Sequence, residues 1–220
     1  MTTLPAGVLF DMDGTLVDSE KVWSVGLDEL AGHLGGELSG AARHAMVGTN
    51  MAQSMTILHD DLGVVADPAE SVRWLEERVA ELFTGGLVWR PGAAELLAAV
   101  RAAGVPTALV TATHRHLVEV ALITIGAANF DAVVAGDDLD ETKPHPAPYR
   151  TAAELIGADP ARCVAIEDSP NGIVSALAAG CAVLGVPSEV ALDEQPGVTL
   201  VPSLEGVTPE SLGRLLPEPR

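Results

Sequence analysis

The sequence has little of several features that mark particular classes of protein. Its two cysteines, Cys163 and Cys181, are too few for a disulfide framework, so we expect buried free thiols in a reducing compartment. No run of about 18 apolar residues is present to span a membrane. No basic segment followed by an apolar stretch begins the chain, so a secretion signal is not expected. These absences favour a cytoplasmic globular protein.

Positive charge is also scarce. The chain has 12 Lys and Arg residues against 31 Asp and Glu residues, and its formal net charge is −19. Such a charge argues against nucleic acid or an anionic membrane surface as a partner, and it repels an anionic substrate. A phosphate-binding site would therefore need a metal ion or a few placed cations. Lys21 and Lys143 are the two lysines, so the position of each is informative.

Aromatic residues make up only 3% of the chain, whereas apolar residues reach 48%, so the core is expected to consist mainly of Ala, Val and Leu side chains. A chain of 220 residues is long enough to bury such a core. It can form one domain or one domain with an insert.

The most informative segment is the apolar run 7–10 followed by Asp11, Asp13, Gly14 and Thr15. Alternation along a strand places Asp11 and Asp13 on one side, at the strand end where parallel sheets bind ligands. Two neighbouring carboxylates need a cation or a shared proton, which predicts a metal, a proton-transfer role, or both. An acidic turn is the alternative, but D-x-D-G-T arises by chance in roughly one chain in several hundred.

Helical and strand-like segments follow in two arrangements. Residues 18–84 show helical spacing and no strand pattern, whereas from Gly92 onward helical segments alternate with short apolar runs. The expected helices cover 21–33, 53–62, 71–83, 93–103, 116–125, 148–156 and 173–179, and the expected strands 7–10, 107–111, 131–135, 163–168 and 181–186. This alternation predicts an α/β fold, a doubly wound parallel sheet with a Rossmann-like core.

The helical stretch is then an insert that leaves the sheet after the first strand. We expect an α/β catalytic core over residues 1–16 and 88–220. A small all-helical cap is expected over residues 17–87, above the strand ends. The tail from Val201 is expected to form a short surface element.

Three further segments place polar side chains at the ends of later strands. Thr111 ends the second strand, Lys143 lies in a Pro-bracketed loop after the third, and the pair Glu167-Asp168 ends the fourth. Each has an ordinary structural explanation, since Thr favours strands, loop lysines are commonly exposed and acids favour helix N-termini. With the first motif, however, the acids can complete a hard-cation site. Oxygen ligands without a His or Cys cluster favour Mg²⁺ over zinc.

In this order the motifs resemble those of the haloacid dehalogenase superfamily of phosphohydrolases. The resemblance covers nearly the whole chain, through D-x-D-G-T at 11–15, Thr111, Lys143-Pro144 and Glu167-Asp168-Ser169. Segments 10–19 and 167–172 are similar to the β-phosphoglucomutase-like branch, whose helical cap also follows the first motif.

The resemblance implies a role for each motif. Asp11 would be the nucleophile that forms an aspartyl-phosphate, and Asp13 the general acid and base. Mg²⁺ would be held by the Asp11 carboxylate, the Asp13 backbone carbonyl and Asp168. Glu167 would be a further or water-mediated ligand.

The resemblance also implies roles for the remaining motif residues and the cap. Thr111 would hydrogen-bond a phosphoryl oxygen, and Lys143 would neutralise the transferring group and the Asp11 carboxylate. The cap would close over the site, exclude water and select the leaving group.

The sequence of the cap favours a phosphatase over a mutase. β-Phosphoglucomutases have a cap histidine and a basic pair that hold a second phosphate, where this chain has Trp23, Val47 and Met51. Lys21 does not fall where phosphonate-cleaving relatives have their cap lysine, and dehalogenases lack an acid at the position of Asp13. We therefore expect a Mg²⁺-dependent phosphomonoesterase of small metabolites, chiefly sugar or polyol phosphates. The alternatives are a β-phosphoglucomutase-type mutase and a non-catalytic phosphometabolite-binding protein, and no motif residue is lost as the latter would require.

Candidate substrate-binding residues lie in the cap and after the second strand: Trp23, Thr111, Ala112, His114 and Arg115. Packing more often explains an apolar helix residue such as Trp23, and a solvated helix start explains His114 and Arg115 at least as well. Many relatives with this kind of cap are monomers, which is the expectation for this chain.

Overall fold

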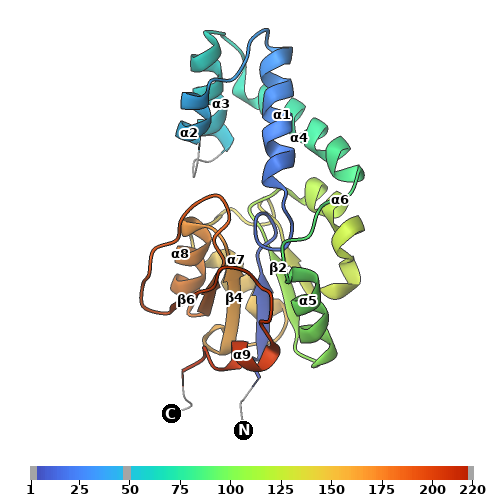
Figure 1. Ribbon diagram of the computed structural model, residues 1–220, viewed down its shortest axis with the longest axis vertical. Helices are drawn as coiled ribbons and strands as arrows, with labels where there is room; N and C mark the ends of the chain where they lie inside the picture. The colour runs from blue at the N-terminus through green and yellow to red at the C-terminus, as the bar shows by residue number, and fades with distance from the viewer. Residues whose placement is uncertain (1–3, 47–50, 218–220) are drawn as a thin grey trace. The chain divides into compact units, whose positions relative to one another are not determined.

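The computed structural model of the chain describes residues 4–46 and 51–217 (Figure 1). The chain divides into two compact units, Met1–Asp18 with Leu87–Arg220, and Ser19–Gly86. The first contains the sheet and the second is helical. That the helical unit acts as a cap stays a prediction.

The first unit is built on a parallel sheet of six strands in the order β3-β2-β1-β4-β5-β6 (Figure 1). The strands are β1 (Gly7–Phe10), β2 (Thr107–Val110), β3 (Ala132–Val134), β4 (Cys163–Glu167), β5 (Ala182–Gly185) and β6 (Val198–Leu200). Strands β1, β2 and β4 are buried along their whole length, as strands covered on both faces are. The predicted α/β class with a doubly wound parallel sheet is confirmed.

The order of the strands fixes where the helices lie. The chain moves from β1 through β2 to β3 on one side, then crosses back to β4 and β5 on the other. Right-handed crossovers therefore place α5 (Ala93–Ala102) and α6 (Arg115–Ile125) on one face, and α7 (Ala147–Leu155) and α8 (Pro170–Ala179) on the other. The order in which the chain adds strands reverses between β1 and β4. In open parallel sheets, ligands bind outside the carboxyl ends of the strands at such a point.

The short elements of this unit include a sixth strand, which was not expected from the sequence, and a helix in the tail, where a short surface element was expected. Strand β6 adds a sixth strand at the edge, and helix α9 (Pro209–Gly213) lies in the tail, with a capping box between Thr208 and Ser211. Each has only three to five residues, too few for a period to show in the sequence.

The helical unit consists of α1 (Glu20–His33), α2 (Gly40–Met46), α3 (Met51–Leu62) and α4 (Pro68–Thr84). Helix α4 begins where the Asp67-Pro68 pair predicts, with the Asp67 side chain accepting a hydrogen bond from the Ala69 N–H at 3.0 Å. Helix α2 was not predicted, because seven residues span barely two turns. Buried apolar side chains form the centre of the unit: Leu30, Met55, Leu58, Leu75 and Val79.

Both cysteines are buried free thiols, as expected. Burial raises the pKa of Cys163 and of Cys181 to about 12, so both stay protonated and pack as small apolar groups. Within 4–46 and 51–217, no helix has the length and apolar character needed to cross a membrane.

Candidate active site

The carboxyl ends of β1, β2 and β4 bring the predicted motif residues together. The Asp11 N–H continues the pairing of β1 with β4 by donating to the Ile166 carbonyl at 3.0 Å. The Thr111 N–H likewise extends β2 along β3, with the Val134 carbonyl at 3.0 Å. The side chains that follow these strands therefore start from a fixed backbone.

Lys143 lies at the centre of the cluster, with a side chain that is 5% exposed. Its Nζ donates to Asp11 Oδ1 at 2.7 Å, to Glu167 Oε1 at 2.6 Å and to the Val110 carbonyl at 2.9 Å. An ammonium has three hydrogens, so all are used. Burial alone would lower the pKa of Lys143, but the Asp11 and Glu167 carboxylates outweigh burial and hold that pKa above its ordinary value.

Asp11 is also buried, and its environment disfavours the ionised form. Burial, together with the neighbouring charges of Glu167 and Asp13, raises the pKa of Asp11 to about 7 despite the opposing effect of Lys143. Its Oδ1 accepts the lysine hydrogen bond, whereas Oδ2 is buried and accepts no hydrogen bond from any residue in 4–46 and 51–217. A buried carboxylate oxygen without a partner is costly, and a bound cation would satisfy it.

Glu167 is fully buried and engaged on both oxygens. Its Oε1 accepts from Lys143 and from the Tyr149 hydroxyl at 2.7 Å, and its Oε2 accepts from the Ser169 N–H at 3.2 Å and the Ser169 hydroxyl at 3.0 Å. Tyr149 was not recognised from the sequence, where it reads as an apolar residue of helix α7. The structure thus makes Glu167 a counter-ion that holds Lys143, with Tyr149 as its second support.

Asp168 lies against the turn that carries the first motif. Its Oδ1 accepts from the Thr15 hydroxyl at 3.4 Å. Gly14 adopts a φ of +77°, and a Cβ at this position would stand 2.0 Å from Asp168 Oδ2. The glycine of D-x-D-G-T therefore allows both the left-handed turn and the close approach of this carboxylate.

Asp13 is half-buried and is held by two hydroxyls. Its Oδ2 accepts from Thr111 Oγ1 at 3.2 Å and from Thr113 Oγ1 at 2.7 Å. Thr111 thus contacts the second aspartate of the motif. Thr113 was missed from the sequence, although a second hydroxyl two residues after a strand-end threonine is a signal that could have found it.

The sequence of the chain matches a known protein family over the segment that holds the residues described above. Residues 5–180 match the family model described as haloacid dehalogenase-like hydrolase. This chain belongs to that family. The family membership predicted from the four motifs is confirmed, and the protein is an enzyme of this hydrolase class.

Relatives of this haloacid dehalogenase-like hydrolase cover almost its full length. Hexitol phosphatase A of Escherichia coli is 33% identical over 92% of this chain and 93% of its own. The phosphoglycolate phosphatase of Neisseria meningitidis is 30% identical over 96% and 94%. The crystal structure of CbbY from Rhodobacter sphaeroides, a mutant in complex with xylulose-(1,5)bisphosphate, superposes with a TM-score of 0.80 at 29% identity, covering 91% of this chain and 95% of that one.

The other predicted substrate-binding residues of this hydrolase are not part of the carboxylate cluster. The Arg115 guanidinium pairs with Asp138 and donates to the Val133 carbonyl at 3.0 Å, which ties it to the end of β3. His114 is the N-cap residue of α6, and Ala112 is exposed. Trp23 lies half-buried on α1 of the helical unit and is described with that unit alone.

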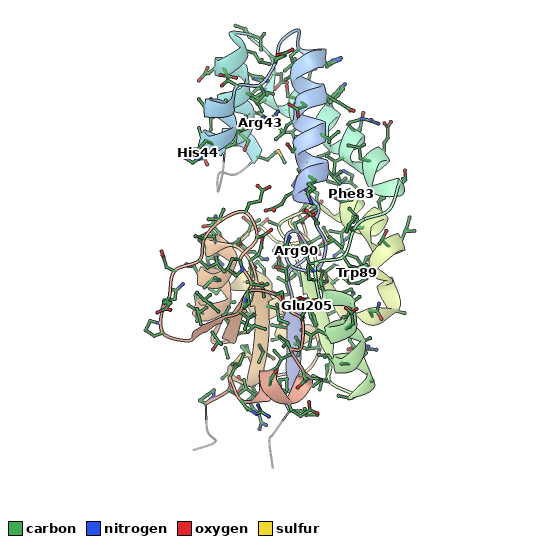
Figure 2. The ribbon with its side chains drawn as sticks, viewed as in Figure 1. Arg43, His44, Phe83, Trp89, Arg90 and Glu205 are labelled. Carbon is green, nitrogen blue, oxygen red and sulfur yellow. The ribbon has the colours of Figure 1, made fainter. Side chains whose placement is uncertain are left out.

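A half-buried cation of the hydrolase core was passed over in the sequence. Arg90 follows Trp89 on the segment that enters the core (Figure 2). Its backbone N–H donates to the Leu16 carbonyl at 2.9 Å. Its Nη2 lies 3.5 Å from the Pro187 carbonyl, and its Nε is buried without a partner within the described part of the chain. Arg90 therefore lies beside the turn of the first motif, although no motif marks it.

Gly172 provides a first test of how tightly the cluster is packed. A Cβ at Gly172 on α8 would stand 1.8 Å from Glu167 Oε1. We expect Gly172→Ala to displace Glu167, to lower the free energy of unfolding by about 1–3 kcal/mol, and to reduce hydrolase activity. Thermal and denaturant unfolding measure the first effect.

Gly32→Ala is the matched control, because this glycine also lies in a helix, α1, and nothing lies within 4 Å of its Cβ position. That change should leave stability unaltered or raise it by about 0.4–1 kcal/mol. Equal effects of the two substitutions would contradict the packing described for Glu167.

Proposed function

We propose that this hydrolase is a Mg²⁺-dependent phosphomonoesterase of small metabolites, acting chiefly on sugar or polyol phosphates. The observation that carries the proposal is Lys143 held between Asp11 and Glu167 at the carboxyl ends of the strands. Asp13 accepts hydrogen bonds from the hydroxyls of Thr111 and Thr113. The relatives named above, a hexitol phosphatase and a protein crystallised with a sugar bisphosphate, support the substrate class.

The residues present fit a Mg²⁺ ion. Asp11, Glu167 and Asp168 each offer an oxygen within 4.8 Å of the others, and Asp11 Oδ2 is the buried oxygen that lacks a partner. An all-oxygen donor set suits this ion. We infer that Asp11 Oδ2, Asp168 and the Asp13 carbonyl hold it. The Glu167 oxygens already accept four hydrogen bonds, so Glu167 would act through water.

The charge of the site explains why a cation is needed. Four carboxylates, those of Asp11, Asp13, Glu167 and Asp168, face one ammonium in a chain whose net charge is −19. A phosphate dianion would be repelled from such a site. When bound, Mg²⁺ supplies positive charge to the phosphoryl oxygens and favours ionisation of Asp11.

The proposed reaction assigns one step to each side chain. Asp11 Oδ1 attacks phosphorus while the bond from phosphorus to the alcohol oxygen breaks, and Asp13 gives its proton to that oxygen. Asp13 then takes a proton from a water molecule whose oxygen bonds to phosphorus, while the bond from phosphorus to Asp11 Oδ1 breaks and releases phosphate and the Asp11 carboxylate. Lys143, beside Oδ1, neutralises charge on the transferring group. Thr111 donates to Asp13 here, so a contact with a phosphoryl oxygen requires its hydroxyl to turn.

The helical unit, Ser19–Gly86, is proposed to select the leaving alcohol. The cap positions that mutases use for a second phosphate carry no cation at Trp23 and Met51, and Val47 lies outside the described residues. This supports net hydrolysis over isomerisation.

Metal binding is expected to be visible in thermal unfolding. Mg²⁺ at about ten times its dissociation constant should raise the melting temperature by about 2–5 °C. Asp168→Asn should remove most of this shift, whereas Glu119→Gln, which changes an exposed acid on α6, should keep it. An unchanged shift in Asp168→Asn would contradict the proposed metal site.

The proposed function is tested by phosphate release from a panel of sugar, polyol and nucleotide monophosphates, with Mg²⁺ and with EDTA. Release from a few members that requires Mg²⁺ supports the proposal and identifies the substrate class. β-Glucose 1-phosphate is included, and formation of glucose 6-phosphate is followed separately. Isomerisation without net phosphate release would overturn the proposal in favour of a mutase.

A further inference from the structure

Thr113, which belongs to none of the four motifs, makes a short hydrogen bond to Asp13. Its hydroxyl is 2.7 Å from Asp13 Oδ2, closer than that of Thr111 at 3.2 Å. Both hydroxyls donate to this one oxygen. The Thr113 N–H in turn donates to Thr111 Oγ1 at 3.0 Å, which directs the Thr111 hydrogen toward Asp13. The two threonines thus form one unit around a single oxygen.

The backbone of Thr113 is fixed from the neighbouring strand. Its carbonyl accepts from the Gly136 N–H at 2.8 Å, in the loop that follows β3. A Cβ at Gly136 would stand 2.0 Å from the Ala112 carbonyl oxygen, so this loop can approach so closely only with glycine there. Thr113 therefore holds Asp13 from a preorganised position.

Two hydroxyls on one oxygen determine which oxygen of Asp13 can transfer a proton. An oxygen that already accepts two hydrogen bonds is poorly placed to carry a hydrogen of its own. The contacts to Oδ2 fix the plane of the carboxyl group, and with it the direction in which Oδ1 presents a proton. A proton donor must be held within hydrogen-bond reach of its acceptor to be effective.

We propose that Thr113 is the positioning residue of Asp13, and that its hydroxyl orients this carboxyl group so that Oδ1 delivers the proton to the departing alcohol. The inference rests on the proposed phosphomonoesterase function. The hydrogen bonds of Thr113 join it to Asp13, Thr111 and Gly136. Its effect is confined to esters whose leaving group needs a proton.

The test compares two leaving groups in the same variants. An alkyl phosphate from the panel releases a strongly basic alkoxide that needs protonation, whereas p-nitrophenyl phosphate releases a stabilised phenolate that does not. The specificity constant kcat/KM is measured for both, because it covers the steps up to phosphoryl transfer and excludes the later hydrolysis of the aspartyl-phosphate. Thr113→Val keeps the shape of the side chain and removes the hydroxyl, and Thr113→Ser keeps the hydroxyl.

We expect Thr113→Val to lower kcat/KM for the alkyl phosphate by about tenfold or more and for p-nitrophenyl phosphate by less than about threefold. Thr113→Ser should restore the alkyl value to within about threefold of the wild type. Thr199→Val makes the same change at an exposed position of β6 and should alter neither value. Thr113→Ala serves in place of Thr113→Val if the latter does not fold.

The outcomes separate this inference from the proposed function. Equal losses on both esters, or no loss on either, would overturn the role of Thr113 while the phosphatase activity of the wild type stands. Failure of Thr113→Ser to restore the alkyl activity would overturn it as well. No phosphate release by the wild type from either ester would overturn the proposed function and this inference together.

Discussion

Replacing Asp11 by asparagine is expected to abolish phosphate release while the protein stays folded. An amide oxygen is not a competent nucleophile here, so activity should fall by at least about a thousandfold. Asparagine has the same shape and can still accept the hydrogen bond from Lys143. It also removes a buried acid whose pKa is raised to about 7. The free energy of unfolding should therefore stay within about 1 kcal/mol of the wild type.

The measurement is the initial rate of phosphate release, with thermal unfolding as the check on folding. Asp140→Asn makes the same chemical change at an exposed position of the loop after β3 and should leave both quantities unaltered. Mg²⁺-dependent turnover by Asp11→Asn at more than a few per cent of the wild-type rate would exclude Asp11 as the nucleophile.

Among the substitutions considered, Lys143→Met is expected to lower the free energy of unfolding the most. The ammonium compensates the buried carboxylates of Asp11 and Glu167, which lie 2.7 and 2.6 Å away. Removing one partner of a buried ion pair leaves uncompensated charge and costs about 3–5 kcal/mol. The melting temperature should fall by about 10 °C, and phosphatase activity should be lost with the charge.

Two further variants show whether charge is the cause. Lys143→Met combined with Glu167→Gln removes one of the uncompensated carboxylates and should recover part of the stability but none of the activity. Lys21→Met, on the exposed start of α1, should change stability by less than about 0.5 kcal/mol. A Lys143→Met protein as stable as the wild type would show that the ammonium does not hold the cluster together.

Much of the site could be predicted from the sequence because each motif follows an apolar run. Strand ends of a parallel sheet share one edge, so Asp11, Thr111, Glu167 and Asp168 were expected to meet there, and the structure brings them together with Lys143. The helical insert could be recognised because its longer helices show a clear period.

The contacts of the supporting residues could not be predicted, because their partners are distant in sequence. Thr113 meets Asp13 across 100 positions of the chain. Tyr149 contacts Glu167 only because α7 packs on the sheet, where Tyr149 joins the apolar core that contains Leu9 and Ala165. Glu167 was expected to be a further or water-mediated metal ligand, and its four hydrogen bonds depend on where Lys143, Tyr149 and Ser169 come to lie. Strand order and side-chain direction decide these contacts, and neither shows in a local pattern.

Transfer of a phosphoryl group to Asp11 can be observed directly in the variant Asp13→Asn. This variant lacks the base that activates water, and p-nitrophenyl phosphate needs no acid to leave, so the aspartyl-phosphate should accumulate. With Mg²⁺ we predict a burst of one nitrophenolate per chain, and mass spectrometry of the quenched protein should place one phosphoryl group on Asp11. If the wild type hydrolyses this ester but the variant shows neither burst nor adduct, or carries the adduct on another residue, the account is contradicted.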